Sequence, residues 1–153
     1  MQKDEVLNHL RQAKSAHIGW VQRAKFLIEG VSISENAIPV NQMECRFGKW
    51  FYGDGQRLQY IRNSPTECMV EIEDLHAQLH SVYFNIYRIY YLQDKKGFFG
   101  KLFGKKDKVS QEEKELAREY YKDIEALSKE LLKQLTLMER RIIVLSAEEI
   151  EKL

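Results

Sequence analysis

Apolar residues recur at alternating steps of three and four over three long stretches of this sequence, and this pattern constrains the fold most. The first stripe consists of Val6, Leu10, Ala13, His17, Trp20, Ala24 and Leu27. Steps of three and four place side chains on one face of an α-helix. We therefore predict a long first helix that ends near Gly30, with Pro39 opposing any continuation.

Two later stretches carry the same period and begin at capping signals. In "SPTE", Ser64 is the expected N-cap, Pro65 the first helical residue and Glu67 the closing residue of a capping box. The stripe that follows consists of Met69, Ile72, His76, Leu79, Tyr83, Ile86 and Tyr90, and this helix should reach about Gln93. "SQEE" opens the final long helix, expected over 110–145. Its inner face would be Ala117, Tyr120, Ile124, Leu127, Leu131, Leu135, Met138 and Ile142.

Between the first two long stretches lies "MECRFGKWFYGDG", Met43 to Gly55, for which we predict a shorter helix over about Val40 to Tyr52. Its apolar face would be Met43, Phe47 and Trp50. "SAEE" near the C-terminus predicts a short last helix, and no stretch shows strand-like alternation. We predict an all-α fold, an antiparallel four-helix bundle with an additional short helix that carries Cys45.

Composition limits the classes of function. A chain of 153 residues with 44% hydrophobic residues suits a single domain over 1–153, and a net charge of +1 gives no bias towards nucleic acid. No apolar run approaches the roughly 20 residues of a membrane span, and the N-terminus lacks a signal-peptide core. We expect a cytoplasmic protein, in which two distant cysteines are free or metal-bound rather than disulfide-bonded.

Three of the four histidines fall on the predicted inner faces of two different helices. His17 belongs to the first stripe, His76 belongs to the second, and His80 follows His76 by one helical turn. A histidine pair at i, i+4 can direct two imidazoles at one metal ion. Each ring can also be a hydrogen-bonded core residue, and an isolated pair of this spacing can arise by chance on a solvated face.

A shared metal ion would satisfy these rings together. Three imidazoles buried without a common partner would leave several hydrogen bonds unmade. Cys45 could complete the set, because three imidazoles and one thiolate suit tetrahedral zinc. Four protein ligands leave no position for a substrate water, so such a site is structural or sensory rather than hydrolytic.

The same residues carry a resemblance to a known family. "HIGW" (His17 to Trp20), "CRFGKWFYGDG" (Cys45 to Gly55) and "HAQLH" (His76 to His80) resemble the motif of the chemoreceptor zinc-binding (CZB) domains. These domains occur in bacterial chemotaxis receptors, in diguanylate cyclases and as stand-alone proteins. The order His, Cys, His, His matches the family's ligand order. The resemblance covers about 1–95 directly, and the last helix fits the family's bundle only in kind.

The resemblance implies a cytoplasmic zinc-binding bundle, here a stand-alone one, with the ligands His17, Cys45, His76 and His80. It also implies a homodimer, a thiolate that hypochlorous acid can oxidise, and a chemoreceptor or diguanylate cyclase as the signalling partner. His9 has no counterpart in the motif, and we expect it to be a surface residue.

Two features stay outside this motif. Cys68 lies about 12 Å along the helix axis from His76, and we expect a partly buried inert thiol, with a resolving role as the alternative. The basic and aromatic loop over 95–109 includes "KKGFFGKLFGKKDK", with six lysines and one aspartate. Its segment 95–108 can contact an anionic membrane surface or an acidic partner, or it can be a loop that covers the end of the bundle.

The leading functional prediction is a zinc-binding sensory or regulatory module without catalytic activity. Zinc buffering is a close alternative. A zinc-dependent hydrolase would need a dispensable ligand and a general base, for which Glu44, Glu73 and Asp74 are near in sequence. A di-iron bundle would need more histidines or paired Glu-x-x-His motifs, which the sequence does not contain.

Overall fold

The regular elements are all helical over 1–61, 66–92 and 109–153, the residues that the computed structural model of the protein describes. The long helices are α1 (Lys3–Ile28), α3 (Thr66–Tyr90) and α4 (Gln111–Val144). The shorter ones are the 3-10 helix η1 (Glu35–Ala37), α2 (Arg46–Phe51), the 3-10 helix η2 (Asp54–Tyr60) and α5 (Ala147–Glu151). The predicted all-α class is confirmed. None of these helices has the length and apolar character needed to cross a membrane.

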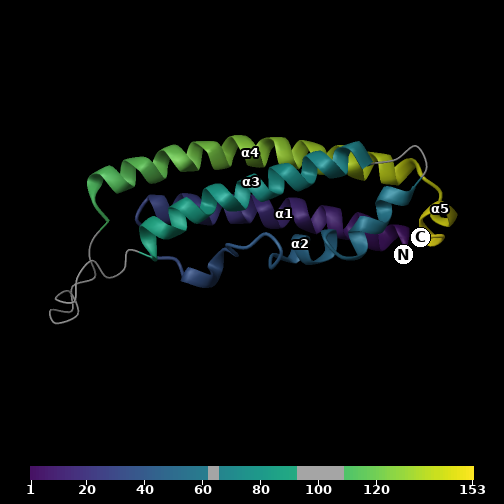
Figure 1. The fold of residues 1–153 in the computed structure, drawn as a ribbon, viewed down its shortest axis with the longest axis horizontal. Coiled ribbons are helices and arrows are strands. Elements are labelled where there is room, and N and C mark those ends of the chain that lie inside the picture. The colour runs from purple at the N-terminus through teal and green to yellow at the C-terminus, as the bar shows by residue number, and fades with distance from the viewer. Residues whose placement is uncertain (62–65, 93–108) are drawn as a thin grey trace.

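The helices α1 and α3 run in the same direction, and α4 runs back along both (Figure 1). At one end the Tyr90 hydroxyl lies 3.5 Å from the Ile28 carbonyl, which brings the ends of α3 and α1 together. At the other end Lys3 Nζ donates to the Ile143 carbonyl at 2.7 Å. The predicted antiparallel four-helix bundle is not confirmed, because three of the helices in the described ranges are long and two of those are parallel.

The predicted apolar stripes line the core. Every member of the α1 stripe is buried, and the α3 stripe is buried through Ile86. On α4 the buried positions include Tyr121 and Ser128, whereas their neighbours Tyr120 and Leu127, predicted to face inwards, are half-buried. The reason is that α4 packs against both α1 and α3, so it buries a broader arc than one stripe of a 3.6-residue period covers.

Most predicted helix ends are observed. Ser110 Oγ accepts a hydrogen bond from the Glu113 amide at 3.1 Å, and the Glu113 carboxylate accepts one from the Ser110 amide at 2.8 Å, which completes the capping box. Ser146 caps α5 in the same way. Past the end of α1, Gly30 adopts a left-handed φ of 89°, a conformation that glycine tolerates best. The start signal at Ser64 and Pro65 and the basic segment 95–108 lie outside the described residues.

The helix predicted over Val40 to Tyr52 is shorter than expected. The Asn41 side chain accepts a hydrogen bond from the Met43 amide at 2.9 Å, so a turn replaces the first part of the helix. Cys45 is consequently the N-cap of α2 rather than a residue inside it. Met43, predicted to face the core, is 50% exposed as a result.

Candidate metal centre

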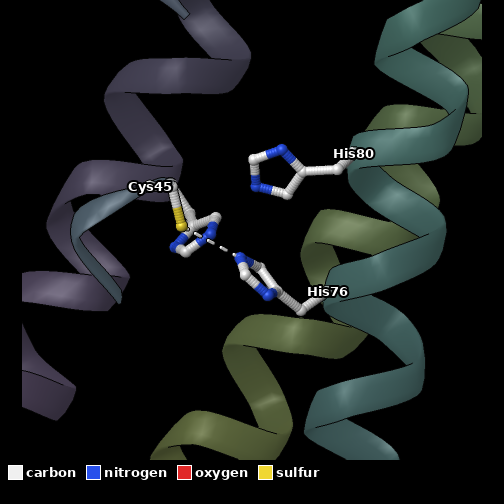
Figure 2. A group of neighbouring side chains, drawn as sticks. Cys45, His76 and His80 are labelled. Atoms are coloured by element: carbon white, nitrogen blue, oxygen red, sulfur yellow. Dashed lines mark hydrogen bonds between the residues drawn. The ribbon is translucent and has the colours of Figure 1, made fainter. Parts of the chain in front are cut away.

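Four side chains from three parts of the fold meet between α1 and α3. His17 comes from α1, His76 and His80 come from α3, and Cys45 comes from the turn before α2. Their ligand atoms all lie within 4.8 Å of one another. Figure 2 shows the labelled side chains of Cys45, His76 and His80 pointing towards one place. The structure therefore brings together all four residues selected from the sequence, in an arrangement that could hold one metal ion.

The Cys45 thiol is fixed by the start of α2. Its Sγ accepts a hydrogen bond from the Gly48 amide at 3.1 Å and lies 3.2 Å from His76 Nε2. A Cβ added at Gly48 would lie 1.8 Å from the backbone oxygen of Gln42, so only glycine lets the preceding turn pack on α2 this closely. The glycine thereby aims the sulfur at the histidines.

Backbone carbonyls orient two of the imidazoles. His17 Nδ1 lies 2.7 Å from the Ala13 carbonyl, and His80 Nδ1 lies 3.1 Å from the Val40 carbonyl. A carbonyl only accepts hydrogen bonds, so each Nδ1 carries the proton and each Nε2 keeps its lone pair. Such a carbonyl partner on the far nitrogen is typical of metal-binding histidines.

Some polar atoms of the cluster have no partner within the described part of the chain. They are His80 Nε2, which would be free to bind a metal, and His76 Nδ1. A buried polar atom without a partner costs about 1–3 kcal/mol. A metal ion would satisfy His80 Nε2, and it would also bind Cys45 Sγ and His76 Nε2, which already face each other. The donor set, with three imidazoles and one thiol, fits zinc.

Burial sets the protonation of the cluster. Desolvation lowers the pKa of His76 to about 2, with smaller contributions from His80 and His17, and it lowers the pKa of His80 to about 4. Burial also lowers the pKa of His17 and raises that of the Cys45 thiol. The imidazoles are therefore neutral at pH 7, which is their ligating form. A divalent cation would provide the charge that stabilises the thiolate.

Aromatic rings surround the cluster. Phe47 contacts His76 edge-on with ring centroids 5.1 Å apart, and Trp20 lies 5.5 Å from His80. Trp50, predicted to lie on the apolar face of the short helix, is buried and stacks on His9 with ring centroids 4.8 Å apart. The expectation that His9 is a plain surface residue missed this contact. The signal available in the sequence was its position three residues after Val6, at the edge of the first stripe.

The remaining candidates lie apart from the cluster. Glu44, Glu73 and Asp74, considered above as general bases for a hydrolase, are exposed and do not join the metal-ligand group. Cys68 is 3% exposed, so it is more deeply buried than expected. Burial raises the pKa of its thiol, which disfavours the reactive thiolate.

Comparison with known proteins agrees with the motif found in the sequence. No curated protein and no solved structure matches the chain. The sequence model of the chemoreceptor zinc-binding domain family matches residues 17–87. This segment begins at His17 and includes Cys45, His76 and His80. Over residues 17–87, the chain is therefore similar to the CZB family of chemoreceptor zinc-binding domains.

Proposed function

We propose that this chain is a zinc-binding regulatory module without catalytic activity, in which His17, Cys45, His76 and His80 bind one zinc ion. The observation that carries the proposal is the convergence of four buried ligand atoms within 4.8 Å. The unpartnered His80 Nε2 supports it, because that atom has a lone pair and no hydrogen-bond donor in the described part of the chain.

The four ligands differ in how firmly the fold holds them. The three histidines belong to α1 and α3, helices of 26 and 25 residues, whereas Cys45 caps a helix of six residues. Short helices depend on their tertiary contacts for stability. Loss of the bond to Cys45 Sγ would therefore release the segment around α2 at much lower cost than moving a long helix. This segment is the part of the module that responds.

Oxidation of Cys45 is one way to break that bond. Bound zinc would keep the sulfur as a thiolate, the form that reacts with oxidants. The thiolate takes the hydroxyl group of hypochlorous acid and releases chloride, which leaves a sulfenic acid. A sulfenic acid is a weaker ligand than a thiolate. The same hydrogen bond from the Gly48 amide that caps α2 would then be disturbed.

The output of such a module passes through another surface. In this proposal the chain acts in the cytoplasm, where reduced thiols keep Cys45 available. It signals through a second copy of itself or through a chemoreceptor or diguanylate cyclase. Zinc level and oxidant are both inputs that the site can read, because each changes the bond to Cys45.

Metal analysis and one variant pair test the proposal. Purified protein should contain about one zinc ion per chain, with X-ray absorption showing three nitrogen ligands and one sulfur ligand. Cys45→Ser should lower zinc affinity and abolish the change in circular dichroism on oxidant addition. Cys68→Ala, the matched control at the other buried thiol, should retain both properties. Equal zinc affinity in Cys45→Ser would show that the assignment is wrong.

A further inference from the structure

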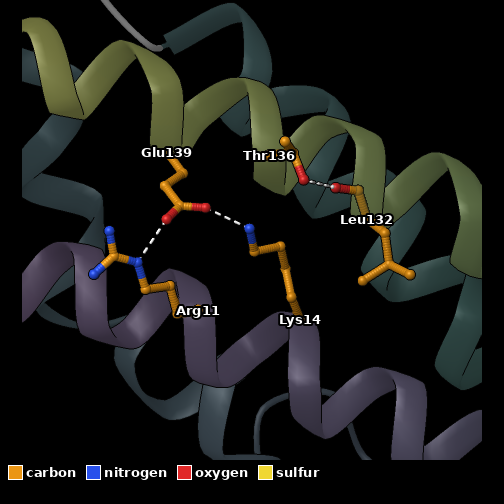
Figure 3. A network of polar contacts seen from close by, with 5 residues as sticks. All are labelled: Arg11, Lys14, Leu132, Thr136 and Glu139. Atoms are coloured by element: carbon orange, nitrogen blue, oxygen red, sulfur yellow. Dashed lines mark hydrogen bonds and ion pairs between the residues drawn. The ribbon is translucent and has the colours of Figure 1, made fainter.

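A buried carboxylate joins α4 to α1 near the candidate metal centre. Glu139 of α4 is 9% exposed. It accepts a hydrogen bond from Arg11 Nε at 2.6 Å and another from Lys14 Nζ, and both cations belong to α1 (Figure 3). These three residues lie outside the segment 17–87 that matches the family.

Lys14 is the better shielded partner in this ion pair. Its side chain is 24% exposed, against 57% for Arg11. The hydrogen bond from Lys14 is also the largest influence on Glu139, and it lowers the pKa of this carboxyl below its usual value. A carboxylate held this way remains ionised, so it needs its cations at a defined place along α1.

The ion pair lies close to the first zinc ligand. Lys14 precedes His17 by three residues, which is about 4.5 Å along the helix axis. His17 is the one member of the ligand group that α1 contributes. The other three come from α3 and from the connection before it. The position of α1 relative to α3 therefore decides whether the group is complete.

Metal binding is far more sensitive to this position than packing is. A slip of α1 by one residue along its axis is about 1.5 Å, whereas metal–ligand distances are held within about 0.2 Å. Apolar side chains can adapt to shifts of this kind at modest cost. An ion pair with directional hydrogen bonds sets the register between two packed helices, and this is the best-attested use of a buried charge.

From this arrangement we propose that Glu139 is a positioning residue for the zinc site, which holds α1 in register with α4 and thereby places His17 against the ligands on α3. The inference rests on the proposed function, because it requires that the four residues bind zinc. α4 contributes no ligand, yet it packs against both helices that do. Metal binding and the α1–α4 register are then reciprocally coupled, so a partner that shifts α4 would change the metal affinity.

The test measures metal binding by the intact chain. Glu139→Gln keeps the shape and removes the charge, and it should weaken Zn²⁺ and Co²⁺ binding about 10-fold, as loss of outer-sphere support does. The Co²⁺ complex should keep its sulfur charge-transfer band and change its ligand-field bands, because Cys45 remains bound while His17 shifts. Glu130→Gln is the matched control on α4, where the exposed carboxylate lies 3.2 Å from Lys133.

A charge swap separates positioning from general stability. Arg11→Glu and Lys14→Glu combined with Glu139→Lys reverse all three charges and should restore the affinity and the Co²⁺ spectrum of the original chain. A Glu139→Gln protein that melts at a lower temperature but binds both metals as before would overturn the inference, and so would a failure of the swap to rescue binding. If the unaltered chain binds neither metal, the proposed function fails and this inference fails with it.

Discussion

Two polar clusters lie between helices of this molecule, and they differ in whether their buried polar groups find partners within the described part of the chain. Around Glu139, one carboxylate and two cations from α1 meet and the charges are paired within the chain. In the His and Cys cluster, three neutral imidazoles and one thiol meet, and His80 Nε2 and His76 Nδ1 find no partner in the described ranges.

The difference shows how buried polar atoms without partners can indicate a ligand. Buried polar groups in proteins are nearly always hydrogen-bonded, so an exception needs an explanation. The Glu139 cluster needs none, and its role is to hold helices together. In the histidine cluster the lone pair of His80 Nε2 has no donor among the described residues, and a zinc ion would accept it.

The largest expected effect comes from adding or removing zinc. Free Zn²⁺ at 1,000 times its Kd should stabilise the folded chain by about 4 kcal/mol. For a chain of this size that corresponds to a rise in Tm of about 8–16 °C, measured by calorimetry in zinc and in a chelator. His80→Ala should lose this response. Equal melting of the original chain in both buffers would contradict the contrast drawn between the two clusters.

A smaller effect is expected at the glycine that aims the sulfur. Gly48→Ala places a Cβ 1.8 Å from the Gln42 oxygen, so the turn must move, which should cost about 3 kcal/mol and weaken zinc binding. Gly19→Ala is the control, because a Cβ there meets nothing within 4 Å and should stabilise α1 by about 0.5–1 kcal/mol. Urea unfolding of both variants checks this. Equal destabilisation would mean that close packing at Gly48 is unimportant.

The smallest effect concerns the ion-paired cluster around Glu139 and depends on pH. Glu139→Gln should cost about 2 kcal/mol at pH 7, the range for a hydrogen bond to a charged group. The Glu139 pKa is lowered in the folded state, mainly by Lys14. Its contribution is therefore present above the unfolded pKa of about 4.3 and is lost as pH falls through the lower folded value.

Urea unfolding of the original chain and of Glu139→Gln, both in chelator, measures this at several pH values. The difference in unfolding free energy should stay constant from pH 7 to pH 5 and shrink below about pH 4. The imidazoles are present in both proteins, so their titration cancels. A difference that persists at pH 3 would show that the negative charge of Glu139 is not the source of its contribution.

Long periodic stretches were the most predictable part of the fold. Over more than twenty residues a 3.6-residue period outweighs local preferences, and the stripes of α1 and α3 lie where predicted. The start of α2 was misplaced, because the side chain of Asn41 competes for backbone hydrogen bonds and sets a turn. Asn41 was a usable signal for this turn, and Cys45 was consequently placed inside a helix that it actually caps.

Contacts between distant parts of the chain were not predictable from one sequence. The partners of Glu139 lie 125 and 128 residues away, and no local pattern links them. The carbonyl of Val40 that orients His80 likewise depends on how the connection folds back on α3. The four candidate ligands could be selected because residue type, helical spacing and the CZB motif agree. Their hydrogen-bonded orientation required the structure.

The parallel course of α1 and α3 has a consequence for how the candidate metal centre can change in evolution. A chain that starts a second helix in the same direction must first return along the length of the first. The described residues 29–61, with Cys45 near their middle, run back in this way. The entropy of closing a tether grows slowly, by about 0.6 kcal/mol for each doubling of length. Insertions in this connection on either side of Cys45 would therefore cost little free energy. Insertions within α1 or α3, the helices that carry the three histidines, would not be tolerated. The metal affinity of the site can therefore change through the connection around Cys45 while α1 and α3 stay the same.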